Sequence, residues 1–171
     1  MSSLCANQQL LEEGMALYET NRVKSLLVFQ KVSYQALCPV QLGIYHYYLG
    51  CLYFSAGPTR HRKFAAIHFR HVMASDFVPP IHKVRAYYYS GIMYAEGVDG
   101  VDFCPHIAYQ YLIHAIITNT DINLQNDIGR FILYLNNRIF NTPPPTSNDS
   151  DVEPLSEQLD KKPRVKRIRK E

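Results

Sequence analysis

One segment of the chain recurs 41 residues later. The first copy is Tyr-Tyr-Leu-Gly-Cys-Leu-Tyr at residues 47–53, and the second is Tyr-Tyr-Ser-Gly-Ile-Met-Tyr at residues 88–94. A second glycine follows each copy, at Gly57 and at Gly97. A single repeat of this length cannot bury an apolar face alone, so a period of about 40 residues predicts stacked helix pairs, the architecture of a solenoid.

A second recurring pattern follows each copy. An alanine with an aromatic residue three positions later occurs as Ala66 with Phe69, and again 42 residues on as Ala108 with Tyr111. Small residues let two helices approach closely, and aromatic side chains fill the groove between neighbours. Each unit is therefore predicted to be one helix with a central glycine and one helix with an alanine and an aromatic residue.

The apolar residues recur at helical spacing, and turn-forming residues separate the runs. The main breakers are Pro39, Gly57 with Pro58, Pro79 with Pro80, residues 97–100, Pro105 and Asp121. The segments between them predict seven helices, at about residues 4–20, 23–36, 40–56, 60–75, 80–96, 103–118 and 122–140. Short connections between successive helices favour antiparallel neighbours.

This pattern resembles the Sel1-like repeat, a relative of the tetratricopeptide repeat. The residues that carry the resemblance are Tyr48, Leu49, Gly50 and Tyr53, then Tyr89, Ser90, Gly91 and Tyr94, and an earlier unit with Gly14, Tyr18 and Phe29. The resemblance covers residues 8–118, and residues 122–140 would form a capping helix. It implies an all-α fold, a short right-handed solenoid of about three antiparallel helix pairs, and a role as a protein-interaction scaffold.

The composition changes after Phe140. Residues 1–140 hold almost all of the aromatic residues and are predicted to form the repeat domain, whereas 141–171 are rich in proline, serine and charge and are predicted to be a disordered tail. Residues 149–160 carry five acids and no base, and residues 161–170 carry seven bases.

The basic end of this tail resembles a nuclear localisation signal. Its residues are Lys161, Lys162, Pro163, Arg164, Lys166, Arg167, Arg169 and Lys170. An import receptor could take such a segment in extended form, and the same bases could contact nucleic-acid phosphates or merely keep the chain soluble. The first interpretation predicts a nuclear protein, with the cytoplasm as a second location.

Composition excludes several classes of protein. Of the 171 residues, 47% are hydrophobic and 19% are charged, so the chain can bury a substantial core. The four cysteines are not spaced for a metal finger or a dense disulfide framework. No run of apolar residues is long enough for a membrane span, and the N-terminus has no basic region before an apolar run. A soluble intracellular protein is expected.

Two sets of residues are candidates for binding a partner. The first set is the tyrosines of the repeated helices, Tyr45, Tyr47, Tyr87 and Tyr88. The tyrosines at residues 87–89 are consecutive and span too much of a helix to face one core. Tyr47 and Tyr88, or Tyr45 and Tyr87, are therefore expected to face the concave surface or the neighbouring unit. They could form a binding groove, because tyrosine is favoured at interfaces, or they could all be structural.

The second set is the basic run at residues 60–63. Arg60, Arg62 and Lys63 fall at the start of a predicted helix, where cations oppose the helix dipole. The run could be a solvated surface, or it could bind an acidic peptide, a phosphate or the acidic block of the tail.

Metal binding and catalysis find no support in the sequence. His68 and His71 lie three residues apart on one predicted helix, but two further ligands would be needed, and neither His61 nor Cys51 stands at a recognised spacing. No nucleophile motif or phosphate loop is present. We predict a non-enzymatic adaptor or small subunit of a nuclear multiprotein complex, without metal or cofactor, which binds a partner segment in its groove. The alternative is a nucleic-acid-associated protein that uses the basic tail and the run at residues 60–63.

Overall fold

The computed structural model describes residues 3–55, 57–97, 99–119 and 121–140. Within these residues the chain forms seven α-helices, one short 3₁₀ turn and no strand. The helices are α1 (Ser3–Tyr18), α2 (Arg22–Phe29), α3 (Pro39–Phe54), α4 (Arg62–Ala74), α5 (Pro80–Glu96), α6 (Pro105–Thr118) and α7 (Ile122–Phe140). The predicted all-α fold is confirmed. The predicted tail, residues 141–171, lies outside the described residues.

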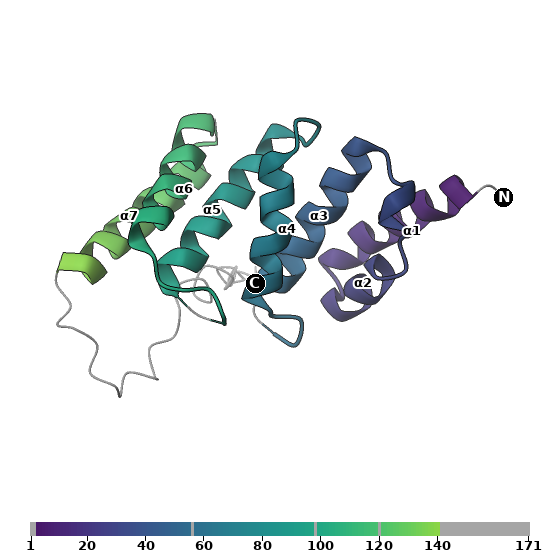
Figure 1. The fold of residues 1–171 in the computed structure, drawn as a ribbon, viewed down its shortest axis with the longest axis horizontal. Helices are drawn as coiled ribbons and strands as arrows, with labels where there is room; N and C mark the ends of the chain where they lie inside the picture. Colours follow the sequence, from purple (N-terminus) through teal and green to yellow (C-terminus); the bar gives the residue numbers. More distant parts are fainter. Residues whose placement is uncertain (1–2, 56, 98, 120, 141–171) are drawn as a thin grey trace, which may run out of the picture.

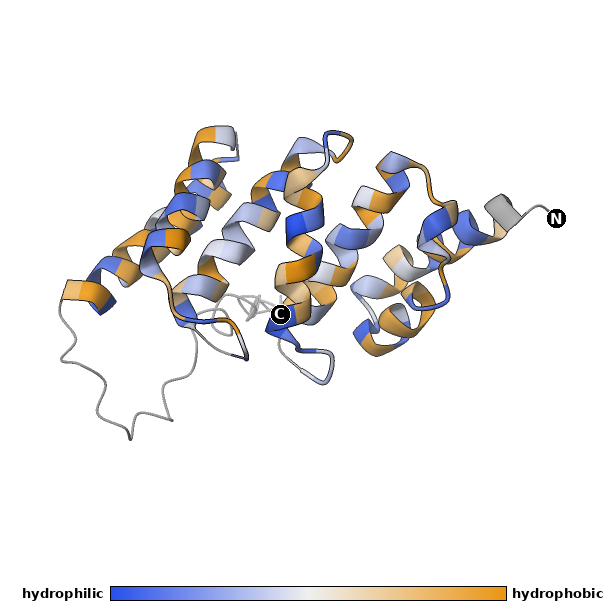
Figure 2. Cartoon of the chain, viewed as in Figure 1, coloured by the Kyte–Doolittle hydropathy of each residue, from blue (hydrophilic) through white to orange (hydrophobic). Residues whose placement is uncertain are grey.

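The helices form a row of pairs. Helix α1 packs on α2, α3 on α4, and α5 on α6, while contacts of α4 with α5 and of α6 with α7 join the units. In Figure 1 the row runs from α1 at one end to α7 at the other. Figure 2 shows hydrophobic and hydrophilic residues alternating along the helices, as expected for helices with one buried face. The chain is therefore a short solenoid of three helix pairs, closed by α7.

Prolines and a glycine set several helix ends. Helices α3, α5 and α6 begin at Pro39, Pro80 and Pro105, where a missing backbone N–H costs no helical hydrogen bond. Helix α5 ends at Gly97, which has a left-handed φ of 64° and donates its N–H to the carbonyl of Met93 at 3.0 Å.

The predicted helix at residues 23–36 is wrong at its C-terminal end. Helix α2 stops at Phe29, and a 3₁₀ turn (Tyr34–Ala36) follows. The backbone N–H of Ser33 donates to Oδ1 of Asn7, 26 residues earlier on α1, at 3.0 Å. This bond between distant parts of the chain holds the turn after α2, so local spacing could not predict it. The other predicted boundaries agree with the structure within two residues.

A glycine in the first helix of each pair faces a bulky side chain of the second helix. An ideal Cβ at Gly50 would stand 2.6 Å from the ring of Phe69, and one at Gly91 would stand 2.7 Å from Leu112. In the first pair, Gly14 would meet the ring of Phe29 at 2.9 Å. The helices of each pair can approach this closely only because no side chain intervenes.

The structure corrects the register of the second helices. The pattern in the sequence equates Ala66 and Phe69 with Ala108 and Tyr111. The residues packed against the glycines are instead Phe69 and Leu112, each preceded by a fully buried alanine four positions earlier, Ala65 and Ala108. Two residues four apart on a helix lie on the same face, so the repeated unit of the second helix is a small residue followed by a large one at that spacing.

The core follows the row of helices in two adjoining clusters. One cluster joins α1, α2 and α3 through Leu11, Phe29, Val32, Tyr45, Leu49 and Leu52. The other runs from α3 to α7 and includes Phe69, Ile92, Leu112, Phe131 and Leu135. Each unit thus buries its apolar face against the next.

Candidate functional site

A groove of about 550 Å³ runs across the first helices of the units. It reaches from the end of α1, across α3 and α5, to the start of α7. Its aromatic lining consists of Tyr18, Tyr47, Tyr48, Phe54, His82, Tyr88 and Tyr89, and its charged lining consists of Glu19, Arg22, Arg85, Asp121 and Asp127. All three helix pairs and α7 contribute residues to the groove, so α7 counts as a fourth unit and the groove forms only when the units are stacked.

Part of the groove lining is an aromatic stack between two units. The ring of Tyr47 on α3 lies against the ring of His82 on α5, with centroids 3.9 Å apart and 12° between the planes. Nη1 of Arg85 donates to the hydroxyl of Tyr47 at 3.4 Å. Tyr47 is 5% exposed, so only a small part of this side chain reaches the groove.

Two buried polar atoms in the groove lining have no hydrogen-bond partner among the described residues. They are the hydroxyl of Tyr88, a residue that is 5% exposed, and Nδ1 of His82. A buried polar atom without a partner costs about 1–3 kcal/mol, so such atoms are uncommon in native proteins. Their presence in one groove marks a position where a bound group could complete the hydrogen bonds.

The groove leaves these groups neutral near pH 7. Burial raises the pKa of the Tyr88 hydroxyl, and the nearby carboxylate of Asp127 adds to this effect. Burial, and next the charge of Arg85, lowers the pKa of His82. Tyr88 therefore keeps its proton and can donate a hydrogen bond.

The structure divides the four candidate tyrosines. Tyr47 and Tyr88 line the groove. Tyr45 does not: it is 9% exposed and packs against Phe29 in the core, with ring centroids 6.0 Å apart. Tyr87 also lies elsewhere, half-buried and stacked on His114 of α6. Of the predicted alternatives, the groove therefore contains Tyr47 and Tyr88, whereas Tyr45 packs on a helix of the neighbouring unit and Tyr87 on the second helix of its own pair.

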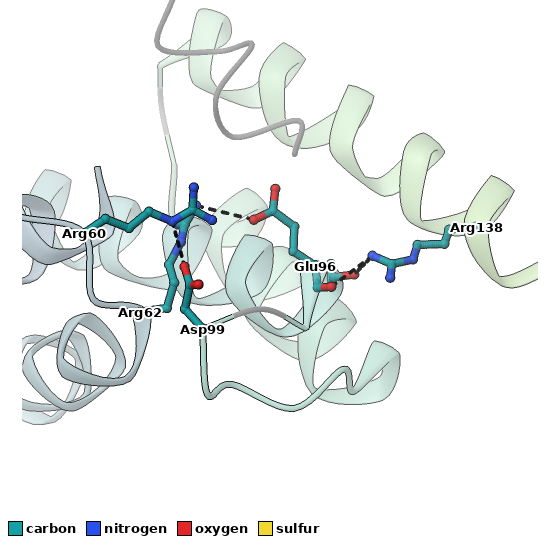
Figure 3. Close-up of polar contacts among 6 residues, drawn as sticks. Arg60, Arg62, Glu96, Asp99 and Arg138 are labelled. Carbon is teal, nitrogen blue, oxygen red and sulfur yellow. Dashed lines mark hydrogen bonds and ion pairs between the residues drawn. The ribbon is translucent and has the colours of Figure 1, made fainter. Parts of the chain in front are cut away.

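The basic run at residues 60–63 is mostly a structural element. Arg62 is 1% exposed, its guanidinium lies 4.0 Å from the centroid of the Phe54 ring, and its Nη2 is 3.4 Å from Oε2 of Glu96. Nε of Arg60 lies 2.7 Å from Oδ2 of Asp99. Figure 3 shows both pairs converging on the end of α5. The proposal of Arg62 as a partner-binding residue must be corrected, because its guanidinium is enclosed between two units.

The other two residues of the run, His61 and Lys63, lie at the start of α4. Lys63 is exposed. His61 caps α4, since its Nδ1 accepts the N–H of Phe64 at 3.4 Å.

Arg138 of α7 contacts the end of α5. Its Nη1 donates to the carbonyls of Ala95 at 2.8 Å and Glu96 at 3.1 Å, so a cation compensates the C-terminal end of α5 (Figure 3).

Three histidines meet between α3 and α4. Nδ1 of His46 lies 2.9 Å from Nδ1 of His68, and the ring of His46 stacks on that of His71 with centroids 4.4 Å apart. Burial, together with the neighbouring histidines, lowers the pKa of both His46 and His68 to about 4. Within the described residues, no group of three His, Cys, Asp or Glu side chains is arranged to hold a metal ion.

Sequence reasoning missed the contributions of Arg22, His82 and Asp127 to the groove. Arg85 is a further groove residue, and the structure places it beside Tyr47. His82 and Arg85 lie three residues apart and precede the tyrosines of α5, which was the one local signal that they share a face. Arg22 and Asp127 come from units far away in the chain, and only the stacking brings them there.

None of the helices that the structure describes is both long and apolar enough to cross a bilayer. Comparisons with protein-family models, with curated proteins and with solved structures return no match to this chain. The Sel1-like resemblance therefore rests on the residues of the chain itself and stays a prediction.

Proposed function

We propose that this protein is a non-enzymatic adaptor, or a small subunit of a nuclear multiprotein complex, whose groove holds a segment of a partner protein. The observation that supports this function best is the presence of Tyr88 and His82, with their unpartnered buried atoms, in a groove that spans all four units.

The lining defines the chemistry of the segment. The Tyr88 hydroxyl requires a hydrogen-bond acceptor, such as a peptide carbonyl. The aromatic side chains of the lining, among them the half-buried Tyr48 and Tyr89, can contact an apolar or planar side chain. Arg22 and Arg85 favour a carboxylate, while Asp121 and Asp127 at the α7 end favour a cation. A polar segment with charges of both signs fits this arrangement.

The state of the buried groups supports a role without catalysis. A general acid or base works best with a pKa near the working pH. Burial raises the pKa of the Cys51 thiol to about 12, and the pKa values of His46 and His68 are lowered to about 4. None of these three groups would exchange protons readily at pH 7.

The nuclear part of the proposal depends on the basic segment at residues 161–170, which lies outside the described residues. Replacing its lysines and arginines with glutamine should shift the protein from the nucleus to the cytoplasm. A protein that stays nuclear after this change would have another route of import.

The test of the groove is affinity purification of the full chain from nuclease-treated nuclear extract, over a series of salt concentrations. One or two partners in near-equal amounts should be recovered with the wild-type protein and strongly reduced with Tyr88→Phe and with Arg85→Gln. The matched control is Tyr87→Phe, which removes a hydroxyl from the neighbouring tyrosine outside the groove and should leave recovery unchanged.

Equal recovery with all of these folded variants would refute the groove as the binding site. Recovery that depends on nucleic acid and falls steeply with salt would favour the nucleic-acid alternative. That alternative loses one of its contacts in the structure, because Arg62 is enclosed between α4 and α5.

A further inference from the structure

Helix α7 occupies the place of a first helix in a fourth unit that has no second helix among the described residues. In the three complete pairs, a glycine of the first helix receives Phe29, Phe69 or Leu112 of the second. Gly129 is the corresponding residue of α7, and nothing lies within 4 Å of where its Cβ would stand. The position that is filled in the other three units is open here.

The open position belongs to a stripe of residues along α7, all of them exposed except the half-buried Asn136. The stripe consists of Ile122, Asn126, Gly129, Leu133, Asn136 and Phe140, at alternating spacings of four and three residues. Ile122 is 64% exposed, Leu133 62% and Phe140 78%. The buried residues Ile128, Phe131 and Leu135 lie on the opposite side of the helix, against the stack. Spacings of four and three are those of a helix seam that packs on another helix.

The stripe is self-complementary about the level of Phe131. Gly129 and Leu133 lie two residues to either side of it, Asn126 and Asn136 lie five, and Ile122 and Phe140 lie nine. If two such helices pack antiparallel with a two-fold axis at this level, each residue meets its counterpart. Leu133 then covers Gly129, Asn126 faces Asn136, and Ile122 faces Phe140.

The complete pairs of this chain use the same complementarity. Their second helices place a fully buried small residue four positions before the large one, as in Ser25 with Phe29 and Ala108 with Leu112. Gly129 and Leu133 have this small-to-large spacing themselves. Helix α7 therefore carries both the glycine of a first helix and the large residue of a second helix.

We propose that the outer face of α7 is the interface of a two-fold symmetric homodimer, in which Leu133 of each copy packs over Gly129 of the other. The proposal is independent of the groove and its ligand. The chain after Phe140 is a less suitable occupant, because no small residue in 141–171 is followed four positions later by a large aliphatic or aromatic one. The charged residue beside the stripe, Arg130, lies 3.7 Å from Asp127 of its own helix, so its charge is partly compensated.

The contact would be modest in size. Helix α7 has 19 residues and is thus roughly 28 Å long, so one helix against one helix falls among the smaller specific interfaces, below about 1,200 Å². A dissociation constant in the micromolar range is expected, and the dimer should form and dissociate with concentration.

Sedimentation equilibrium of the full chain, from the low-micromolar to the high-micromolar range, tests this proposal. A monomer–dimer equilibrium is expected for the wild-type protein. Leu133→Asp and Gly129→Leu should shift the dissociation constant upward at least tenfold. Ile117→Asp is the matched control, because Ile117 is 74% exposed on α6 and lies outside the stripe.

Two further measurements show that the variants are folded and that the proposed residues meet in the dimer. Circular dichroism should show that each variant retains the helicity of the wild-type chain, and Gly129→Leu should not melt earlier, because leucine favours a helix over glycine. In a mixture of Asn126→Cys and Asn136→Cys chains, oxidation should link position 126 to position 136, whereas neither chain alone should link to itself through these positions. A chain that stays monomeric throughout the range, or a dimer that is unaffected by Leu133→Asp, would overturn the proposal.

Discussion

Arg62 and Glu96 form an ion pair that is almost completely enclosed, with side chains that are 1% and 3% exposed and a distance of 3.4 Å between Nη2 and Oε2. The pair joins the start of α4 to the end of α5, and thus ties one unit of the stack to the next. Isolated charges are costly to bury, so each of these two residues depends on the other.

Glu96→Ala should therefore destabilise the protein by about 3–5 kcal/mol, since it leaves the guanidinium of Arg62 buried without its carboxylate. Urea unfolding followed by circular dichroism measures this loss. Asp99→Asn is the comparison, because the pair of Arg60 with Asp99 is 20% and 44% exposed, and exposed pairs contribute about 0–1 kcal/mol. Similar losses in the two variants would contradict the assigned role of Glu96.

Glycine-to-alanine changes at two positions should change the free energy of unfolding in opposite directions. Gly50→Ala should lower the free energy of unfolding by about 1–3 kcal/mol, because its Cβ would stand 2.6 Å from the Phe69 ring and force the helices apart. Gly129→Ala should raise it by about 0.5–1 kcal/mol, because alanine favours the helix and nothing lies within 4 Å. Urea unfolding at a protein concentration well below the micromolar dissociation constant expected for the proposed dimer provides the measurement.

Two tyrosine-to-phenylalanine changes in the groove should also change the free energy of unfolding in opposite directions. Tyr88→Phe removes a buried hydroxyl that has no partner among the described residues, so the free energy of unfolding should rise by about 1 kcal/mol. Tyr47→Phe removes the acceptor of the Arg85 hydrogen bond and should lower it by about 0.5–1.5 kcal/mol. Thermal and urea unfolding of both variants would show this contrast. A Tyr88→Phe variant that is less stable than the wild type would indicate that the hydroxyl has an essential contact within the protein.

Stability should decrease as the pH falls from about 6.5 to about 4. Burial lowers the pKa of His46 and of His68 to about 4 in the folded chain, from 6.5. Between these values the unfolded chain binds protons that the folded chain does not, so acidification favours unfolding. Well above pH 6.5 both histidines are neutral in either state, and this contribution no longer changes.

Denaturation curves at several pH values measure this effect. The double variant His46→Gln with His68→Gln should show a weaker pH dependence between pH 4 and 6.5 than the wild-type chain. If the two dependences are the same, other groups must account for the acid sensitivity.

The order of helices could be read from the sequence because its causes are local. Prolines at 39, 80 and 105 begin helices, Gly97 ends one, and the spacing of apolar residues gives each helix one buried face. Close packing at Gly14, Gly50 and Gly91 could also be predicted, because a small residue that recurs in successive helices indicates that another helix lies close to it.

Contacts between distant residues decided the rest. Asn7 of α1 holds the turn after α2, although 26 residues separate it from Ser33. Stacking also encloses Arg62 and brings Arg85 beside Tyr47, so two cations that look alike in the sequence have opposite surroundings.

The sequence by itself thus determined the order of the helices and the glycines at which the paired helices approach each other. Only the tertiary structure decided the register of the second helices, which tyrosines line the groove and that the glycine of α7 is left open. The physical reason is that helix formation depends on residues within a few positions of one another, whereas burial, ion pairing and a groove depend on which helices are placed side by side.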